Sequence, residues 1–144
     1  MTRTIYVLNG PNLNLLGLRE PDIYGSDTLD DIAGMLEDRA RSLDLSIDIR
    51  QTNHEGMLVD WLHEAQAEGA KAVLLNAGAY THTSIALLDA IRAIATPVIE
   101  VHLSDPKTRE PFRHISYIGM AAVQTVQGHG ARGYIMALDA AARL

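Results

Sequence analysis

Cysteine is missing from the 144 residues of this chain. Without a thiol, the protein has no disulfide bond, no thiolate nucleophile and no sulfur-ligated zinc site. Lysine is scarce as well, because only Lys71 and Lys107 occur. Lys71 opens a predicted strand, at the end away from where α/β proteins bind ligands, and Lys107 lies in a predicted loop. Catalysis through a lysine Schiff base is therefore disfavoured.

Long apolar runs are missing too, which bears on where the protein works. No run approaches the roughly 20 residues that span a bilayer, and no basic and apolar signal segment precedes the first predicted strand. We expect a cytoplasmic protein with no membrane partner. The formal net charge is −6 and the arginines are scattered, so a nucleic-acid partner is also disfavoured. A local pair of arginines could still bind a small anion.

Segments with strand character alternate with segments of helical character along the chain. The 47% hydrophobic content suits one domain over residues 1–144. The alternation predicts a doubly wound, three-layer α/β sandwich whose five-stranded parallel sheet has the order 2-1-3-4-5. Ligands bind such sheets beyond the carboxyl ends of the strands, at the switch point between strands one and three. The strands are predicted at 4–8, 45–51, 71–75, 97–102 and 121–126, and the helices at 29–43, 57–69, 85–94 and 134–142.

The segment 9–25 follows the first predicted strand and has neither a strand nor a helix period. It begins with a sharp Gly10-Pro11 turn and carries a guanidinium at Arg19 and a phenol at Tyr24. A loop this long in a compact domain is usually functional, often as a lid. The structural alternative is an ordered loop whose asparagines only close turns.

Two further polar clusters follow strands three and four. Residues 76–84 are small and polar, and Thr83 or Ser84 is placed to cap the next helix. In strand four, Glu100 and His102 are two residues apart and so share one face. A histidine at a strand end with a carboxylate behind it is typical of an oriented acid or base, the alternative being a structural histidine. The loop 103–113 adds Ser104, Arg109 and Arg113 as candidate anion-binding groups.

Other readings of the sequence are weaker. The glycines of 128–133 match the G-x-G-x-x-G dinucleotide pattern, but the chain has no acidic residue about 20 positions on, so tight strand–helix packing explains them better. Ser84, His102 and Asp89 could form a nominal triad, yet no G-x-S-x-G elbow surrounds the serine. No P-loop or metal-ligand spacing occurs. A nucleotide- or flavin-binding module and an inactive assembly subunit stay open, while acid–base chemistry on a small anion is favoured.

Four motifs together resemble one enzyme family. They are the run from Asn9 to Gly25, Asn76-Ala-Gly-Ala-Tyr-Thr-His-Thr-Ser84, Glu100-Val-His-Leu-Ser104 and Arg109-Glu-Pro-Phe-Arg113. From end to end the chain resembles type II 3-dehydroquinate dehydratase. The resemblance implies a flavodoxin-like fold, a homo-oligomer that is a dodecamer of trimers, and no metal or cofactor. It also implies anti elimination of water from 3-dehydroquinate to give 3-dehydroshikimate, either in the shikimate pathway to chorismate and the aromatic amino acids or in quinate breakdown.

The resemblance also assigns roles to individual residues. Tyr24 matches the base and His102 the proton donor, with Glu100 as the partner of the histidine. Arg19 matches a residue that supports the transition state, and Asn12 one associated with a water at the enolate oxygen. Arg19, Tyr24 and Arg109 belong to the lid. Substrate binding is assigned to Asn76, His82, Asp89, Leu103, Ser104 and Arg113.

Two further expectations concern residues of this set. Asp89 stands well into the third predicted helix, and in the family it serves a neighbouring subunit's site. We expect Arg19 and Arg113 to favour the Tyr24 phenolate, because a phenolate near neutral pH needs roughly 4 kcal/mol. One guanidinium about 4 Å away supplies about that much.

The loop after strand four departs from the family pattern at one position. Asp105 stands where the family generally has asparagine. Its charge would weaken binding of an anion unless Lys107 or Arg109 neutralises it.

Overall fold

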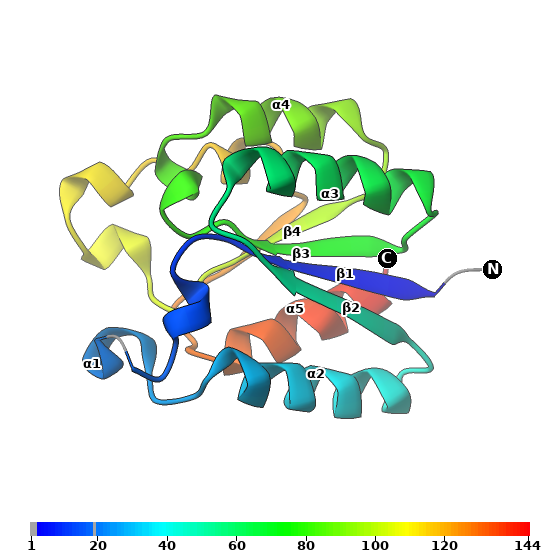
Figure 1. The fold of residues 1–144 in the computed structure, drawn as a ribbon, viewed down its shortest axis with the longest axis horizontal. Coiled ribbons are helices and arrows are strands. Elements are labelled where there is room, and N and C mark those ends of the chain that lie inside the picture. The colour runs from blue at the N-terminus through cyan, green and yellow to red at the C-terminus, as the bar shows by residue number, and fades with distance from the viewer. Residues whose placement is uncertain (1–2, 19) are drawn as a thin grey trace.

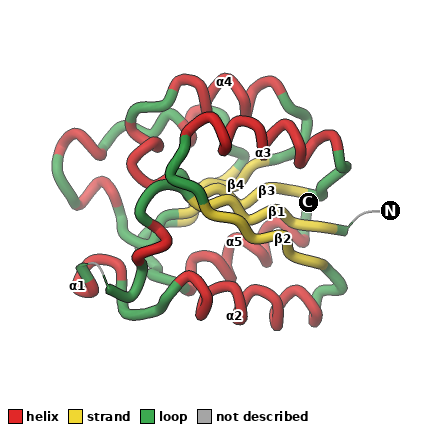
Figure 2. The backbone as a smooth tube through the Cα atoms, viewed as in Figure 1, coloured by secondary structure: helices red, strands yellow, loops and turns green. Residues whose placement is uncertain are grey.

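A five-stranded parallel sheet in the order β2-β1-β3-β4-β5 forms the middle layer of the protein. The structure is a computed structural model that describes residues 3–18 and 20–144. Helices α3 and α4 cover one face of the sheet and α2 and α5 the other (Figures 1 and 2). The predicted α/β fold class and strand order are therefore confirmed. The strands are β1 Thr4–Asn9, β2 Ser46–Gln51, β3 Ala72–Asn76, β4 Val98–Val101 and β5 Gln124–Val126.

The helices begin and end near the predicted positions because local signals are strong. The Thr28 side chain accepts from the Asp31 amide and Asp31 bonds back to the Thr28 amide, which makes a capping box at the start of α2. Ser84 caps α4 by accepting from the Leu87 amide. The α-helices are α1 Pro21–Tyr24, α2 Leu29–Ser42, α3 Glu55–Ala67, α4 Ile85–Ala93 and α5 Arg132–Ala142, and the 3-10 helices are η1 Leu13–Leu15, η2 Gly78–His82, η3 Pro106–Thr108, η4 Pro111–Arg113 and η5 Ile118–Met120.

Two apolar clusters fill the spaces between the layers. Leu74 of β3 packs into the cluster under α2 and α5, and its neighbour Leu75 packs into the cluster under α3 and α4. All five residues of β3 are buried, as expected of a central strand. Burial of each large side chain stabilises the fold by roughly 1.5–3 kcal/mol. By contrast, β2 is only partly buried, in agreement with its predicted place near the sheet edge.

Two segments differ from the sequence expectation. The last strand is shorter than predicted, because the amides of Ala121 and Ala122 turn back to bond the carbonyl of Ile118 in η5. The loop after β1, predicted without regular structure, contains the four-residue helix α1, which Pro21 opens at its first position. On the described residues, no helix is long and apolar enough to cross a membrane.

The loops after β1, β3 and β4 meet at the carboxyl edge of the sheet, on the left of Figure 1. Asn9 and Asn76 are register partners at the ends of β1 and β3. The next residue, Gly10, donates its amide to the Asn76 carbonyl at 2.8 Å. A Cβ at Gly10 would lie 2.5 Å from the carbonyl oxygen of Ala77, so only glycine lets the two loops approach this closely.

Candidate active site

A polar cleft lies at this edge of the sheet, at the switch point between β1 and β3. Its volume is about 90 Å³, which is small beside the roughly 300 Å³ of typical ligand pockets. A wider hollow of about 350 Å³ adjoins it and shares His82, His102, Pro106 and Arg113. The lining residues are Pro11, Asn12, Leu13, Tyr24, Asn76, Gly78, Ala79, His82, His102, Leu103, Ser104, Pro106, Arg109 and Arg113.

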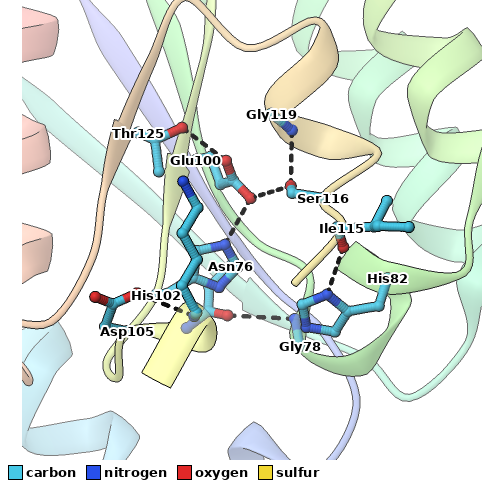
Figure 3. Close-up of polar contacts among 11 residues, drawn as sticks. Asn76, Gly78, His82, Glu100, His102, Asp105, Ile115, Ser116, Gly119 and Thr125 are labelled. Carbon is cyan, nitrogen blue, oxygen red and sulfur yellow. Dashed lines mark hydrogen bonds and ion pairs between the residues drawn. The ribbon is translucent and has the colours of Figure 1, made fainter. Parts of the chain in front are cut away.

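The buried pair of Glu100 and His102 forms one wall. His102 Nε2 lies 2.6 Å from Glu100 Oε2, which confirms that the two side chains share a face (Figure 3). Two hydroxyls also donate to this carboxylate, Ser116 at 2.5 Å and Thr125 at 2.7 Å. Burial raises the pKa of Glu100, but the bonds from His102, Ser116 and Thr125 outweigh it and hold the pKa below its ordinary value. Glu100 is therefore a carboxylate at neutral pH.

The charge on Glu100 decides how the His102 ring is protonated. An ionised carboxylate can only accept, so Nε2 of His102 carries a hydrogen. This contact leaves the second ring nitrogen, Nδ1, for a ligand. This is the arrangement expected of a histidine that is oriented by a buried anion.

His82 lies beside this pair and differs from His102 in its hydrogen-bond partner, which is a backbone carbonyl rather than a carboxylate. Its Nδ1 is 2.7 Å from the carbonyl oxygen of Ile115, so Nδ1 carries the hydrogen and Nε2 is an acceptor (Figure 3). Burial lowers the pKa of His82, and the neighbouring His102 and Arg113 lower it further. The rings of His82 and His102 are stacked with centroids 6.5 Å apart. His82 is thus a neutral hydrogen-bonding group beside the histidine that Glu100 orients.

Tyr24 faces the cleft from the opposite side. Arg109 Nη1 donates to the Tyr24 hydroxyl at 2.8 Å, and the guanidinium carbon lies 5.2 Å from the ring centroid. Arg113 instead donates to Glu110 at 2.9 Å. The sequence-based expectation named Arg113 as a partner of the phenol, whereas the structure places Arg109 there. Arg19, the other expected partner, lies outside the described residues.

Asn12 projects from the loop after β1 in a strained conformation. Its φ of 69° lies in the left-handed region, which is unusual for a residue other than glycine. The amide of Asn12 donates to Asn53 Oδ1 at 3.0 Å, and this bond helps to hold the strained backbone in place.

The remaining expected site residues fall into two groups. Leu103 and Ser104 line the cleft, and their carbonyls accept from Gly130 and Gly128, which ties this loop to the start of α5. Asp89 is exposed on α4 and is not part of the cleft lining of its own chain. Asp105 accepts from the Lys107 backbone amide and caps η3, so it too lies outside the cleft lining.

Several polar partners of the site had no signal in the sequence analysis. Thr125 is the register partner of Glu100 in β5, a relation that becomes visible only once the strand pairing is known. Ser116 lies in an irregular segment before η5. Among the described residues, no group of three or more His, Asp or Glu side chains is placed to hold a metal ion.

The fold and the cleft define a flavodoxin-like α/β protein with a polar cleft, lined by histidine, tyrosine and arginine side chains, at its switch point. The chain belongs to the class II dehydroquinase family, whose model, described as Dehydroquinase class II, matches residues 3–142. A relative from Hyphomonas neptunium named 3-dehydroquinate dehydratase is 58% identical over 144 residues, covering 100% of this chain and 96% of the relative. The resemblance inferred from the motifs is thereby confirmed.

Solved structures of the same family have the same architecture. The type II dehydroquinase from Butyrivibrio crossotus superposes with a TM-score of 0.95 at 40% identity, covering 97% of each chain. The type II dehydroquinase from Propionibacterium acnes gives a TM-score of 0.94 at 42% identity, covering 100% of this chain and 99% of that one.

Proposed function

We propose that this protein is a 3-dehydroquinate dehydratase that removes water from 3-dehydroquinate by anti elimination through an enolate, giving 3-dehydroshikimate. Its family and the name of its relative support dehydratase activity as a lyase of the shikimate pathway. The observation that carries the mechanism is the placement of a carboxylate-bound histidine and an arginine-bound tyrosine around one cleft. These are the two kinds of group that proton removal and hydroxyl departure require.

The first step is removal of the proton next to the ketone. The Tyr24 phenolate accepts this proton, and the electron pair moves to the ketone oxygen to form the enolate. The Arg109 guanidinium beside the hydroxyl favours the phenolate, since an adjacent positive charge stabilises an anion. Arg19 supplies further positive charge by analogy with the family. Asn12 positions a water that donates to the enolate oxygen.

The second step is departure of the hydroxyl group. The enolate electrons re-form the ketone and make the new carbon–carbon double bond, while the hydroxyl takes a proton from His102 and leaves as water. Glu100 keeps the His102 ring oriented for this step. Tyr24 ends with one more proton and His102 with one fewer, so exchange with solvent restores both groups. No electron donor, metal ion or cofactor enters this scheme.

The other lining residues hold the substrate. Leu103 and Ser104 take the carboxylate side of the ligand, and Asn76, His82 and Arg113 bind its oxygen atoms. The described part of the segment 18–25 acts as the lid. Its residue Leu18 is 84% exposed, and its residue Tyr24 lines the cleft, so the segment stands where it can cover a bound substrate.

We further propose that the protein works as an oligomer, a dodecamer built from trimers, in which Asp89 serves a neighbouring subunit's site. Asp89 is exposed and lies outside the cleft of its own chain. A second support is a set of exposed apolar side chains on α4 and in the segment 112–123, which suits subunit contact. These side chains are Ile85, Phe112, Ile115, Met120 and Val123.

Direct turnover tests the reaction. Purified protein mixed with 3-dehydroquinate should produce the absorbance of a conjugated enone, and turnover should survive exhaustive chelation and borohydride treatment with substrate. Borohydride trapping on Lys71 or Lys107 would rule the mechanism out. A folded protein that generates no enone would rule the function out.

Shared sites can be tested by complementation. We expect Asp89→Ala and Tyr24→Phe each to be nearly inactive, and their co-expressed mixture to regain activity. If each site takes Tyr24 from one subunit and Asp89 from another, an equal and random mixture of the two variants has both residues intact at about one quarter of the sites. A mixture with only the sum of the two residual activities would show that Asp89 and Tyr24 do not act across a subunit boundary.

A further inference from the structure

Three buried polar side chains are joined to one another behind the cleft, and one of them also lines it. Asn9 and Tyr134 are fully buried, and Asn76 is 4% exposed. They come from the ends of the two central strands and from the inner face of α5. Only Asn76 reaches the cleft lining, so the mechanism above gives Asn9 and Tyr134 no part.

These side chains form one continuous line of hydrogen bonds. Asn9 Nδ2 donates to the Arg50 carbonyl at 3.0 Å, and the Tyr134 hydroxyl donates to Asn9 Oδ1 at 2.6 Å. Asn76 Nδ2 donates to the Tyr134 oxygen at 3.0 Å, and the Gly78 amide donates to Asn76 Oδ1 at 3.2 Å. The last of these bonds is drawn in Figure 3.

Backbone groups at both ends fix the direction of every bond in the line. The Arg50 carbonyl can only accept, so Asn9 must turn its NH₂ group toward it and its oxygen toward Tyr134. The hydroxyl then donates to Asn9 and is left to accept from Asn76. The Gly78 amide can only donate, so it also requires the oxygen of Asn76 on its side. Burial raises the pKa of Tyr134, which keeps the hydroxyl proton in place.

After these hydrogen bonds, the Asn76 amide has one N–H group left for a ligand. Its oxygen is bonded to Gly78 and its first N–H to Tyr134, while the side chain lines the cleft. An asparagine amide can ordinarily turn over and offer either a donor or an acceptor. Here the turned-over form would point its NH₂ group at the Gly78 amide, and two donors would face each other.

We propose that Tyr134 and Asn9 are positioning residues that fix the Asn76 amide as a hydrogen-bond donor toward an accepting oxygen of the substrate. This inference rests on the proposed function, because it concerns how the same cleft holds 3-dehydroquinate. The site thereby prefers ligands with a lone pair at this position over ligands with a hydrogen there. Tyr134 and Asn9 touch no substrate and act only through Asn76.

A double-mutant cycle on binding of 3-dehydroshikimate, the product, tests this role. The four proteins are wild type, Tyr134→Phe, Asn76→Ala and the double variant, with the dissociation constant measured by calorimetry. We expect Tyr134→Phe to weaken binding about tenfold, the usual effect of freeing a buried polar group. In the Asn76→Ala background the same change should have less than a twofold effect. KM should rise with the dissociation constant, while kcat changes less.

A matched control and a second variant complete the experiment. Tyr6→Phe removes another hydroxyl on a buried tyrosine, which donates to Glu64 away from the cleft, and should leave binding unchanged. Asn9→Leu breaks the same line of hydrogen bonds at its other end and should weaken binding as much as Tyr134→Phe does. It therefore tests the proposal independently if Tyr134→Phe does not fold.

The outcomes separate this inference from the proposed function. Equal weakening by Tyr134→Phe in both backgrounds would overturn the positioning role, as would wild-type affinity in Tyr134→Phe or Asn9→Leu. If the wild-type protein turns over 3-dehydroquinate but the cycle is additive, only the positioning role is refuted. If the folded wild-type protein neither turns over 3-dehydroquinate nor binds 3-dehydroshikimate, the proposed function is refuted as well.

Discussion

The floor of the cleft is formed by Asn76 and His102, with Glu100 behind the histidine, and it is more buried than the rim, formed by the described residues of 11–25 and by 103–113. Glu100 is 1% exposed and accepts three side-chain hydrogen bonds. On the rim, Tyr24 is half-buried and accepts a hydrogen bond from Arg109. In the proposed mechanism, the acid side of the site is therefore held in place before a ligand arrives, whereas the base side depends on how the rim closes.

The largest effect should come from the rim. Tyr24→Phe deletes the base, so kcat should fall by about 10³-fold or more, within the range that a general base contributes. Binding of 3-dehydroshikimate should stay within about twofold of wild type, because the floor is untouched. Steady-state kinetics and calorimetry measure the two quantities. A parallel loss of binding would mean that Tyr24 holds the ligand and that the division between rim and floor is misplaced.

Next in size is Glu100→Gln, which removes the charge from the floor. We expect kcat to fall about 10²-fold, since His102 loses the anion that orients its ring. Stability should change with pH as well. The pKa of Glu100 is lowered in the fold, so its contribution to stability is complete above its ordinary value of 4.5 and is lost as the pH falls through the lowered value.

Melting temperatures from pH 7 down to pH 3 measure this contribution. The gap between wild type and Glu100→Gln should narrow on the acid side. A gap that stays constant with pH would show that the carboxylate is not the source of the difference.

Arg109→Gln should have a smaller effect. The change removes the 2.8 Å hydrogen bond to the Tyr24 hydroxyl, so kcat should fall about tenfold while the dissociation constant of 3-dehydroshikimate stays within about twofold of wild type. Steady-state kinetics and calorimetry measure the two quantities. A loss of binding as large as the loss of kcat would instead assign Arg109 to holding the lid or the substrate.

The smallest expected loss of kcat is that of Thr125→Val, for which Thr108→Val is the control. Thr125→Val removes one of the three donors to Glu100, and we expect kcat to fall about three- to tenfold. Thr108 donates to the backbone carbonyl of Asp105 on the rim, so Thr108→Val should stay within about twofold of wild type. If both variants behave alike, the donors around Glu100 contribute little to catalysis.

Local sequence patterns predicted the floor well, because strand geometry determines it. Alternation along β4 was enough to place Glu100 and His102 on one face, and their 2.6 Å contact follows from it. The strand order brought the clusters after β1, β3 and β4 to one edge. These features depend on periodicity and topology, which a single sequence carries.

The partners of these residues could not be predicted in the same way. Tyr134 fitted the apolar stripe of the last helix, and nothing near it in sequence marks its hydroxyl as a partner of Asn9, 125 positions away. Arg109 and Arg113 are four residues apart in an irregular loop, so only the turns of η3 and η4 decide which one meets Tyr24. Which residues become hydrogen-bond partners here depends on tertiary packing, and the apolar periodicity of the sequence does not record it.

The bond between Asn9 and Tyr134 also bears on when the site is complete during synthesis. Asn9 leaves the ribosome early, and its partner follows 125 residues later. Until α5 docks, the buried Asn9 and Asn76 amides lack the hydroxyl that joins them, however well β1, β2 and β3 have paired. A ribosome-bound chain that stops before residue 134 can therefore form much of the sheet without a finished site.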